Sequence, residues 1–578
     1  MKKWLLTLLL LAACAPNAPA TETSDDFLPL VTADATHEAD LVLHNGAIYT
    51  VDEAQPWAEA VAIKAGRLIF VGADEDVEPF IGEATEIMDL GGRMVLPGIH
   101  DVHLHPLEAG SSVGGTCLLP EDTDPAEMVG LLRDCAPKQI GTNWVLGWGH
   151  SITNMLESER PPIEILDEAI PDRPAVMMEQ TSHSVWVNSA ALAAAGMNAD
   201  TPNPPGGLIL KDPETGEPNG ILMENAGDML FDLALAPTPE LEELHYDGLL
   251  YALEQLAENG ITSISDARTY WGRNYHKVWQ RAEQEETLTV RAVLGLWAYP
   301  HYDDAEQLAA LTKLYSNDPN RLLRMSQIKI YSDGLIENTT AALFEPYLID
   351  LEIFPDNIGM NYFAETRLAK YITTLEKVGF DFHIHTIGDR GVYEALNAIE
   401  QAVETNGNGL DRRHRLTHLE LIDEADRLRF AELDVIADFQ VAGEFTLPDY
   451  WEESAELIGD RAFDPVPVRS IYDTGATVTL SSDWDVSDLS PFVGMAHALQ
   501  REQQSMPDLE AVIEAYTLNG AYVMRQETET GSLEVGKWAD LVVLDQNLFE
   551  VSLDEMAETA VLLTLLGGEE VYRNPSFR

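Results

Sequence analysis

The chain has 578 residues, 45% of them hydrophobic, so it can bury a large core and is expected to form more than one domain. Its 98 acidic residues outnumber 35 lysines and arginines, which gives a formal net charge of −63 at pH 7. That charge excludes a nucleic-acid partner, which needs a basic surface, and argues against charge-driven docking on anionic lipid. Because the acids are spread along the chain, they predict a solvated surface adapted to high salt; steering of a cationic substrate is the alternative.

Residues 1–20 have the pattern of a bacterial secretion signal. A basic start is followed by an apolar stretch, Trp4–Ala13, that is short for a membrane span. Leu11–Cys14 resembles a lipobox, which predicts cleavage before Cys14 and lipidation of its thiol. A plain signal peptide cut near Ala18–Ala20 is the alternative. Residues 21–39 are polar and acidic and are expected to be a flexible tether. The chain is therefore predicted to lie on the extracytoplasmic side of a bacterial envelope, held only by its lipid.

Short strand-like segments lie at both ends of the remaining chain, in residues 40–93 and 531–578. Asn-Gly and Ala-Gly turns separate several of them. The predicted strands are Leu41–Leu43, Ala47–Val51, Ala60–Ile63, Arg67–Gly72, Ala539–Leu544 and Glu570–Tyr572. The local patterns do not reveal how these strands pair.

A histidine pair follows the next predicted strand. Met94–Leu96 is apolar enough for a buried strand, and a Pro-Gly pair then breaks it. Beyond the break, His103 and His105 lie two residues apart. In an extended chain alternate side chains share a face, so both imidazoles would point into one space that suits a divalent metal. A lone His-x-His pair is a weak signal, and most such pairs bind no metal, so its weight depends on the rest of the chain.

Residues 106–258, which follow, are too many for an ordinary connection between strands. They contain strand-like runs of their own, Trp144–Trp148 and Ala175–Met178. They are therefore expected to form an insertion, which would cap the mouth of the α/β barrel that the later strands predict. The two cysteines of this insertion, Cys117 and Cys135, are not spaced as a zinc cluster. In an oxidising compartment they would form a disulfide, and two separate buried thiols are the alternative.

Further along, polar side chains recur at the ends of predicted strands. Lys329 lies in one strand, His385 ends another, and His418 and Asp483 end two more. These strands alternate with helical patterns, as in a parallel α/β barrel, whose active sites lie at the carboxyl ends of the strands. The predicted barrel strands are Met94–Leu96, Thr262–Asp266, Thr289–Leu296, Ile328–Tyr331, Phe380–His385, Arg415–His418, Val435–Phe439 and Thr477–Ser481, and the helices include Leu368–Val378, Gly391–Val403 and Leu509–Thr517.

In these sequence motifs the chain resembles the amidohydrolase superfamily, specifically family 3, the YtcJ-like branch. The matching phrases include Leu96–His105, Trp186–Leu192, Pro205–Gly207, Gly260–Ser263, Lys329, Asp333–Gly334, His385–Arg390, His418–Glu420, Ser482–Asp483 and Gly531–Asp545. The resemblance runs from about Leu41 to Tyr572. It implies an α/β fold in which a (β/α)8 TIM-like barrel, residues 94–530 with the cap 106–258, adjoins a small β-sandwich built from residues 40–93 and 531–578.

The resemblance also implies a centre of two divalent metal ions, with zinc the expected metal. The implied ligands are His103, His105, Lys329, His385, His418 and Asp483. The two histidines of the first pair would hold the more buried ion together with Asp483. Lys329 would carry a CO2-derived carbamate that bridges both ions; an ordinary lysine paired with Asp333 is the alternative. His383 shares a face with His385, so the assignment of that ligand could slip by two residues.

The chemistry implied by the resemblance is hydrolysis. A metal-bridging hydroxide would attack a carbonyl carbon, with Asp483 as general base and then general acid. The bond is expected to be the non-peptide C–N bond of a small N-acyl or N-formyl compound. A cyclic amide, lactone or ester is one alternative, and a solute-binding lipoprotein without catalysis is another. A homodimer remains an open expectation.

Substrate contacts are expected from His183, Trp148 and Trp484; packing within the insertion or core is the alternative for each. Two positions depart from the family pattern near the barrel mouth. Trp484-Asp485 replaces a small residue and Pro, and Gln440-Val441 replaces Gln-Pro. These departures leave the metal ligands intact, but the substrate of a relative cannot be transferred to this chain.

Overall fold

The computed structural model describes residues 38–111, 117–121, 123–351, 354–443 and 450–577. The predicted signal, the lipobox with Cys14 and nearly all of the predicted tether lie outside the described residues. Residues 38–578 form one compact unit. Within the described ranges, no helix has both the length and the apolar character needed to cross a bilayer.

The centre of the fold is an eight-stranded sheet in which every neighbouring pair is parallel. Its strands are β8 (Ile99–Leu104), β14 (Ile261–Thr269), β15 (Arg291–Trp297), β16 (Leu323–Tyr331), β17 (Asp381–Thr386), β18 (Arg415–His418), β19 (Ile436–Gln440) and β20 (Val478–Ser481). They are buried along their whole length, as expected for parallel strands covered on both faces. The predicted TIM-like barrel is therefore confirmed.

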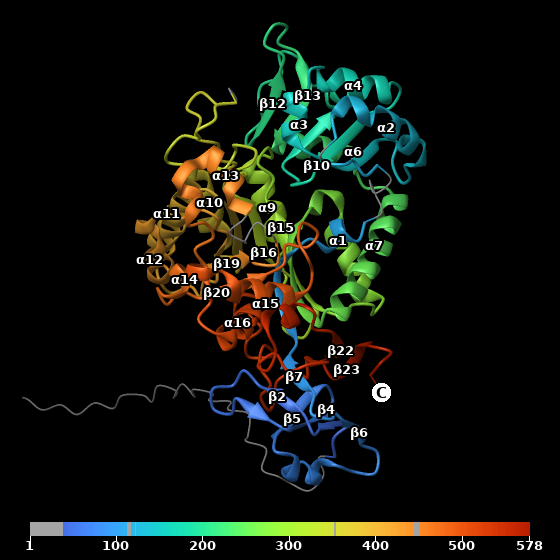
Figure 1. Ribbon diagram of the computed structural model, residues 1–578, viewed down its shortest axis with the longest axis vertical. Coiled ribbons are helices and arrows are strands. Elements are labelled where there is room, and N and C mark those ends of the chain that lie inside the picture. The colour runs from blue at the N-terminus through green and yellow to red at the C-terminus, as the bar shows by residue number, and fades with distance from the viewer. Residues whose placement is uncertain (1–37, 112–116, 122, 352–353, 444–449, 578) are drawn as a thin grey trace, which may run out of the picture. The chain divides into compact units, whose positions relative to one another are not determined.

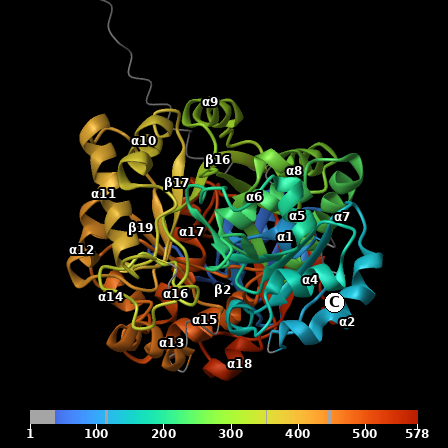
Figure 2. The ribbon, with the colours of Figure 1, turned by 90° about the horizontal axis from the view of Figure 1, so that it is seen from above.

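Helices lie around the outside of these strands, and α8–α12 are seen end-on or obliquely in Figure 2. In α10, for example, Leu368, Ile372 and Leu375 are buried at helical spacing and form an apolar stripe. The helices after β8 and between the later strands are α1 (Pro106–Ala109), α7 (Pro239–Glu258), α8 (Tyr275–Gln284), α9 (Asp304–Leu314), α10 (Glu365–Leu375), α11 (Asp389–Asn406), α12 (Glu424–Glu432), α13 (Trp451–Ile458), α14 (Val468–Tyr472), α15 (Pro491–Gln500), α16 (Leu509–Tyr516) and α17 (Leu518–Val523).

The predicted first barrel strand is wrong. Met94–Pro97 is a separate strand, β7, which pairs with β2 and β21 outside the barrel, and the first barrel strand is β8. The chain passes from one sheet to the other at Gly98, where a Cβ atom would come within 2.1 Å of Thr262 Oγ1, so only glycine fits. The apolar run predicts the wrong strand because β8 itself, Ile99–Leu104, contains three buried polar residues, His100, Asp101 and His103, and is less apolar than β7.

Two further sheets contain strands from the chain ends, shown in blue and red in Figure 1. The six-stranded sheet has the order β23-β22-β21-β7-β2-β3, and the four-stranded sheet has the order β5-β4-β1-β6. Side chains from both, such as Leu43, Val95 and Leu541, form one buried cluster. The bounds are β1 (Leu41–His44), β2 (Ala47–Tyr49), β3 (Trp57–Ala58), β4 (Ala60–Lys64), β5 (Arg67–Gly72), β6 (Glu86–Asp89), β21 (Leu541–Leu544), β22 (Val561–Leu566) and β23 (Glu569–Arg573), with α18 (Leu553–Ala557) between β21 and β22.

Between β8 and β14 the chain forms a five-stranded sheet of order β12-β13-β11-β10-β9, with a buried cluster on each face. Figure 1 shows it, in cyan and green, away from the terminal strands. The elements are β9 (Val145–His150), β10 (Ala175–Glu179), β11 (Ser184–Val187), β12 (Gly207–Lys211), β13 (Pro218–Glu224), α2 (Val129–Cys135), α3 (Ile152–Glu157), α4 (Pro162–Ala169), α5 (Ser189–Ala195) and α6 (Asn225–Ala234).

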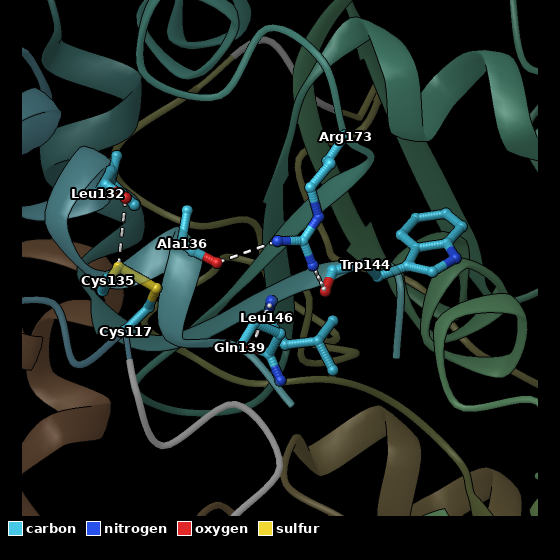
Figure 3. The surroundings of a disulfide bond; sticks show 8 residues. All are labelled: Cys117, Leu132, Cys135, Ala136, Gln139, Trp144, Leu146 and Arg173. Carbon is cyan, nitrogen blue, oxygen red and sulfur yellow. Dashed lines mark hydrogen bonds between the residues drawn. A yellow bond between two sulfur atoms is a disulfide. The ribbon is translucent and has the colours of Figure 1, made fainter. Parts of the chain in front are cut away.

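A disulfide joins Cys117 to Cys135 in this region (Figure 3). The two cysteines are therefore bonded to each other and are not separate buried thiols. The bond ties the segment before β9 to α2. The same segment pairs with β9 through two backbone bonds: Trp148 N–H donates to Cys117 O at 2.9 Å, and Leu119 N–H donates to Trp148 O at 2.7 Å.

Candidate metal centre

The histidine pair and the aspartate after β20 meet at the carboxyl end of the barrel. His103 lies near the end of β8, and His105 follows it. The Nε2 atoms of these two histidines lie 3.4 Å and 3.1 Å from Asp483 Oδ1. All three residues are buried, with 6% or less of their surface exposed. The spacing of the pair along an extended strand therefore does bring both imidazoles to one carboxylate.

Two more histidines reach the same place from neighbouring strands. His385 comes from β17 and His418 from β18, and their ring centroids are 4.4 Å apart. His418 Nδ1 lies 3.8 Å from Asp483 Oδ2. Both His418 and Asp483 have positive φ, 74° and 59°, which is uncommon for residues other than glycine. Such backbone strain is concentrated at functional sites, where the surroundings hold it in place.

Lys329 completes the predicted set from β16. Its side chain is fully buried, and Nζ lies 3.5 Å from His103 Nε2. Burial holds the pKa of Lys329 well below its usual range, which favours a neutral amine. The alternative partner, Asp333, is engaged elsewhere: its carboxylate accepts hydrogen bonds from the backbone N–H groups of Ala342, Ile387 and Gly388. Lys329 forms no salt bridge within the described part of the chain.

These residues fit divalent metal ions. One ligand atom each of His103, His418 and Asp483 lies within 4.8 Å of the others. His385 Nδ1 is buried without a hydrogen-bond partner among the described residues. Asp483 Oδ1 and His105 Nδ1 are also buried and make no well-formed hydrogen bond there, although an imidazole or a carboxylate lies 3.1–3.4 Å from each. Buried polar atoms are normally satisfied, so a cluster of imidazole and carboxylate atoms with so few well-formed hydrogen bonds fits the binding of a cation. Imidazole and carboxylate are the ligands that zinc prefers outside thiolate sites.

His383 takes a different place from His385. It lies deeper in the barrel, where its Nε2 is 3.0 Å from His103 Nδ1 and its Nδ1 accepts a hydrogen bond from Arg415 at 2.6 Å. With His103 and Asp438 it forms a second group whose ligand atoms are within 4.8 Å of one another. His383 therefore contacts the far nitrogen of His103, the position from which a supporting residue orients a metal ligand.

The charge state of the central carboxylate follows from its neighbours. Burial would raise the pKa of Asp483, but contacts with His105, His418 and Lys329 lower it to about 2. The carboxylate is therefore ionised at neutral pH, as both metal binding and proton acceptance require.

A cavity of ≈ 110 Å³ opens over these groups. Its lining includes His105, His385, His418 and Asp483 from the strand ends and His183 from the insertion. His183 Nδ1 lies 2.7 Å from Glu224 Oε2 within the insertion, so His183 both hydrogen-bonds there and faces the cavity. Trp148 lines a neighbouring cavity instead. Trp484 lines neither cavity and packs partly buried against the barrel core.

Several cavity residues were not identified from the sequence. Arg268 donates to the Tyr331 hydroxyl at 2.9 Å and pairs with Glu108 at 3.2 Å, and Glu108 in turn lies 3.3 Å from His105 Nδ1. Arg268 and Tyr331 are at the ends of barrel strands, which was an available signal. No sequence signal indicates Glu224, the partner of His183, because the two residues are 41 positions apart in the sequence.

Comparison with known proteins bears on this site. A protein-family model, the amidohydrolase family, matches residues 86–572. Protein LONG AFTER FAR-RED 3 of Arabidopsis thaliana is 27% identical, over 94% of this chain and 94% of its own length. N-substituted formamide deformylase of Arthrobacter pascens is 27% identical, over 92% of this chain and 98% of its own length. The crystal structure of an uncharacterized metal-dependent hydrolase from Pyrococcus horikoshii OT3 has a TM-score of 0.69 at 23% identity, over 89% of this chain and 99% of that one, a likeness of fold.

Proposed function

The chain belongs to the amidohydrolase family and is a metal-dependent hydrolase, and from this premise we propose that it cleaves the non-peptide C–N bond of a small N-acyl or N-formyl compound. The observation that carries the proposal is the convergence of four histidines, a buried lysine and an ionised aspartate beneath one cavity. The likeness to N-substituted formamide deformylase over 92% of this chain supports an N-formyl compound among the candidate amides.

In the proposed centre, His103, His105 and Asp483 would hold one ion, and His385 and His418 would hold the other. When bound, such ions supply Lewis-acid polarisation of a carbonyl group and lower the pKa of water toward neutrality. The carboxylate of Asp483 takes the proton of the attacking water and passes it to the leaving nitrogen. Zinc is the proposed metal, because the ligand atoms are imidazole nitrogens and carboxylate oxygens.

The residues of the cavity orient the substrate. Burial lowers the pKa of His183, but the carboxylate of Glu224 raises it by more. The pKa of His183 therefore lies above its ordinary value, and the protonated ring is favoured. With Nδ1 held by Glu224 at 2.7 Å, Nε2–H of His183 is the donor we assign to the substrate carbonyl oxygen. Arg268 and Tyr331, joined by a 2.9 Å hydrogen bond, form the adjacent wall.

A matched substrate panel tests the reaction. The metal-loaded enzyme is assayed against N-alkyl formamides, other N-acyl amines, cyclic amides, lactones and esters of the same carbon skeleton. Turnover of the linear amides is expected to exceed that of the other classes. A preference for esters over matched amides by orders of magnitude would overturn the C–N assignment. Tight binding of a panel compound that is recovered unchanged, with no turnover of any member, would favour a solute-binding protein.

The carbamate on Lys329 is a separate part of the proposal. A fully buried lysine without an ion-pair partner among the described residues supports it. Burial favours the neutral amine, and addition of that amine to CO2 with loss of a proton would give an anionic carbamate that can bind metal. Enzyme refolded without CO2 is expected to bind metal weakly and to recover on addition of bicarbonate. Recovery with metal alone would contradict a carbamate.

The envelope location remains a proposal from the sequence, because Cys14 lies outside the described residues. Intact mass spectrometry is expected to find acyl chains on a protein that begins at Cys14, and Cys14→Ser should release the enzyme into the soluble fraction. A soluble wild-type protein that starts after Ala20 would contradict the anchor. We also propose that residues 40–93 and 531–578 act as one β-sandwich domain and residues 106–258 as a cap; the six-stranded sheet, which contains strands from both chain ends, supports the first.

A further inference from the structure

A second cavity, of ≈ 230 Å³, adjoins the catalytic one. Short chain segments contribute to both walls. His105 and Asp483 line the catalytic cavity, while Glu108 and Asp485, two or three residues further along, line the second. Glu108 also pairs with Arg268, a residue of the catalytic wall, at 3.2 Å. Glu108 also lies 3.3 Å from His105 Nδ1, so a side chain of the second cavity is in contact with the proposed metal centre.

Most of the wall of this second cavity is apolar and aromatic. Trp148 and Phe231 come from the insertion, and Tyr270 and Tyr275 come from the barrel side. Aromatic faces bind apolar groups and also attract cations. Apolar cavities of roughly 150 Å³ hold benzene in other proteins. The second cavity is therefore large enough for an aromatic ring or a short alkyl chain.

Three carboxylates interrupt the apolar wall, and one of them, Glu108, is paired with Arg268. Asp228 lies in α6 and Asp485 follows β20, and neither takes part in a salt bridge with any residue that the structure describes. The one arginine of the wall, Arg273, pairs with Asp232 at 2.7 Å instead. Tyr270 donates to Asp228 at 3.5 Å, which leaves most of the carboxylate's hydrogen-bonding capacity unused. The wall therefore carries an excess of negative charge beside aromatic rings.

A buried imidazole points to a hydrogen-bonding ligand in the same place. His245, from α7, is 3% exposed and lines the cavity. Neither of its ring nitrogens has a hydrogen-bond partner in the described ranges. Burial lowers the pKa of His245 to about 4, so the ring is neutral at pH 7 and one nitrogen is an acceptor. A ligand that brings N–H donors would satisfy this nitrogen and the carboxylates together.

We propose that this cavity is a substrate subsite for an apolar or aromatic group that ends in a protonated amine. Asp228 and Asp485 neutralise the ammonium, His245 accepts one of its hydrogens, and the aromatic wall holds the carbon skeleton. That the ligand is part of the substrate rests on the proposed amide hydrolysis, since the cavity adjoins the catalytic groups. The substrate class is then an N-acyl or N-formyl amine with a second, free ammonium group. The net charge of −63 would also raise the local concentration of such a cation.

Binding tests the subsite without turnover. The probes are 2-phenylethylammonium and 2-phenylethanol, which match in size and differ in charge, measured by calorimetry on the full metal-loaded chain. Salt at about 1 M screens the general acidic surface. The ammonium is expected to bind about tenfold more tightly than the alcohol, and Asp228→Asn should remove most of that preference. Equal affinity of the two probes for the wild-type protein would overturn the subsite.

Two further variants locate the effect. Asp247→Asn removes an exposed carboxylate from the same helix as His245 and is expected to keep the full preference. Trp148→Ala should weaken both probes, because it removes part of the shared apolar wall. If Asp247→Asn lowers the preference as much as Asp228→Asn does, the ammonium is held by the general field of the protein and the subsite is wrong.

Turnover separates this inference from the proposed function. N-(6-aminohexyl)formamide and N-heptylformamide differ only in a terminal ammonium against a methyl group. Their ratio of kcat/KM is expected to favour the ammonium by about tenfold and to fall in Asp228→Asn. If both are hydrolysed equally, the subsite fails while amide hydrolysis stands. If neither is hydrolysed but the ammonium probe keeps its preference in binding, the proposed hydrolysis fails while the cation site stands.

Discussion

The backbone N–H of Asp483 donates a 2.8 Å hydrogen bond to the carbonyl oxygen of His103. This bond lies just beyond β20 and joins the end of the last barrel strand to the first. The N–H of His105 then donates to the Trp484 carbonyl, so the two segments stay paired past the metal ligands. The carboxylate and both imidazoles are thereby positioned by the closure of the barrel, which is more rigid than a surface loop.

The two histidines of β17 should behave differently. His385 is the proposed ligand, whereas His383 contacts the far nitrogen of His103. At saturating metal, His385→Ala is expected to retain about one ion per chain and His383→Ala about two, the latter with roughly 10–100-fold weaker affinity, as for other residues that orient a ligand. Metal titration followed by elemental analysis measures both. The reverse result would make His383 the metal ligand in place of His385.

Removal of the proposed proton carrier should slow the chemistry while the fold survives. Asp483→Asn keeps the size of the side chain but cannot take a proton, so kcat is expected to fall by about 10²–10⁴. Asp488→Asn, an exposed acid a few residues further on, is the matched control and should retain wild-type kcat. Metal content is measured on both variants. An Asp483→Asn enzyme with wild-type kcat would remove Asp483 from the mechanism.

How far the sequence predicts this site depends on where each residue lies. His385, His418 and Lys329 are in or directly after barrel strands, and the carboxyl ends of parallel strands meet at one edge. Their convergence could therefore be inferred from strand order alone. The family resemblance supplied their roles, which strand order does not.

Other features could not be predicted because they depend on contacts between distant segments. Arg268 and Glu108 are 160 residues apart and come together only because the chain returns to the barrel after the insertion. Met94–Leu96, predicted as a barrel strand, lies in another sheet for a related reason. Its apolar sequence fits either a barrel strand or a strand between β2 and β21, and only the second pairing exists.

A buried acid at the other end of the barrel should stabilise the fold in a pH-dependent way. Burial would raise the pKa of Glu376, but hydrogen bonds from His414, Arg412 and Asn406 lower it to about 2 from its ordinary value of 4.5. Since the folded pKa is depressed, this stabilisation is complete above pH 4.5 and is lost as the pH falls toward 2.

Glu376→Gln is therefore expected to lower the free energy of unfolding at pH 7 by about 3–5 kcal/mol, because the nearly buried Arg412 loses its partner. The difference from wild type should shrink as denaturation is repeated at lower pH. Glu570→Gln, which removes an exposed partner of Arg573, is the control and should cost less than about 1 kcal/mol. A difference that stays constant with pH would contradict the assignment of the depressed pKa.

The disulfide should support the second cavity as well as the fold of the insertion. Cys117 precedes Leu118, and both Leu118 and Trp148 line the cavity. The bond closes a loop over a sequence separation of 18, for which chain entropy predicts a stabilisation of about 3 kcal/mol. The double variant Cys117→Ser, Cys135→Ser is expected to melt earlier and to bind 2-phenylethylammonium more weakly. Dithiothreitol should reproduce both effects in the wild type and leave the variant unchanged. A wild-type melting temperature insensitive to reductant would contradict a stabilising bond.

The acidic composition predicts a strong dependence of stability on salt. With a net charge of −63, many like charges repel one another at low ionic strength, where the Debye length is roughly 30 Å at 0.01 M. At 1 M salt that length is only about 3 Å, so most of the repulsion is screened. Single surface pairs are each worth about 0–1 kcal/mol, but their sum can rival a stability of roughly 5–15 kcal/mol.

The melting temperature is therefore expected to rise markedly between dilute buffer and molar NaCl. The metal centre should contribute little to that change, because its ligands are buried and salt screens buried groups much less than exposed ones. Glucose or another neutral osmolyte at equal osmolality is the control, since it excludes volume without screening charge. The metal-loaded and metal-depleted proteins should show the same slope against the logarithm of salt. A melting temperature that does not change across this range would mean that the acids are already compensated, and adaptation of the surface to high salt would have to be rejected.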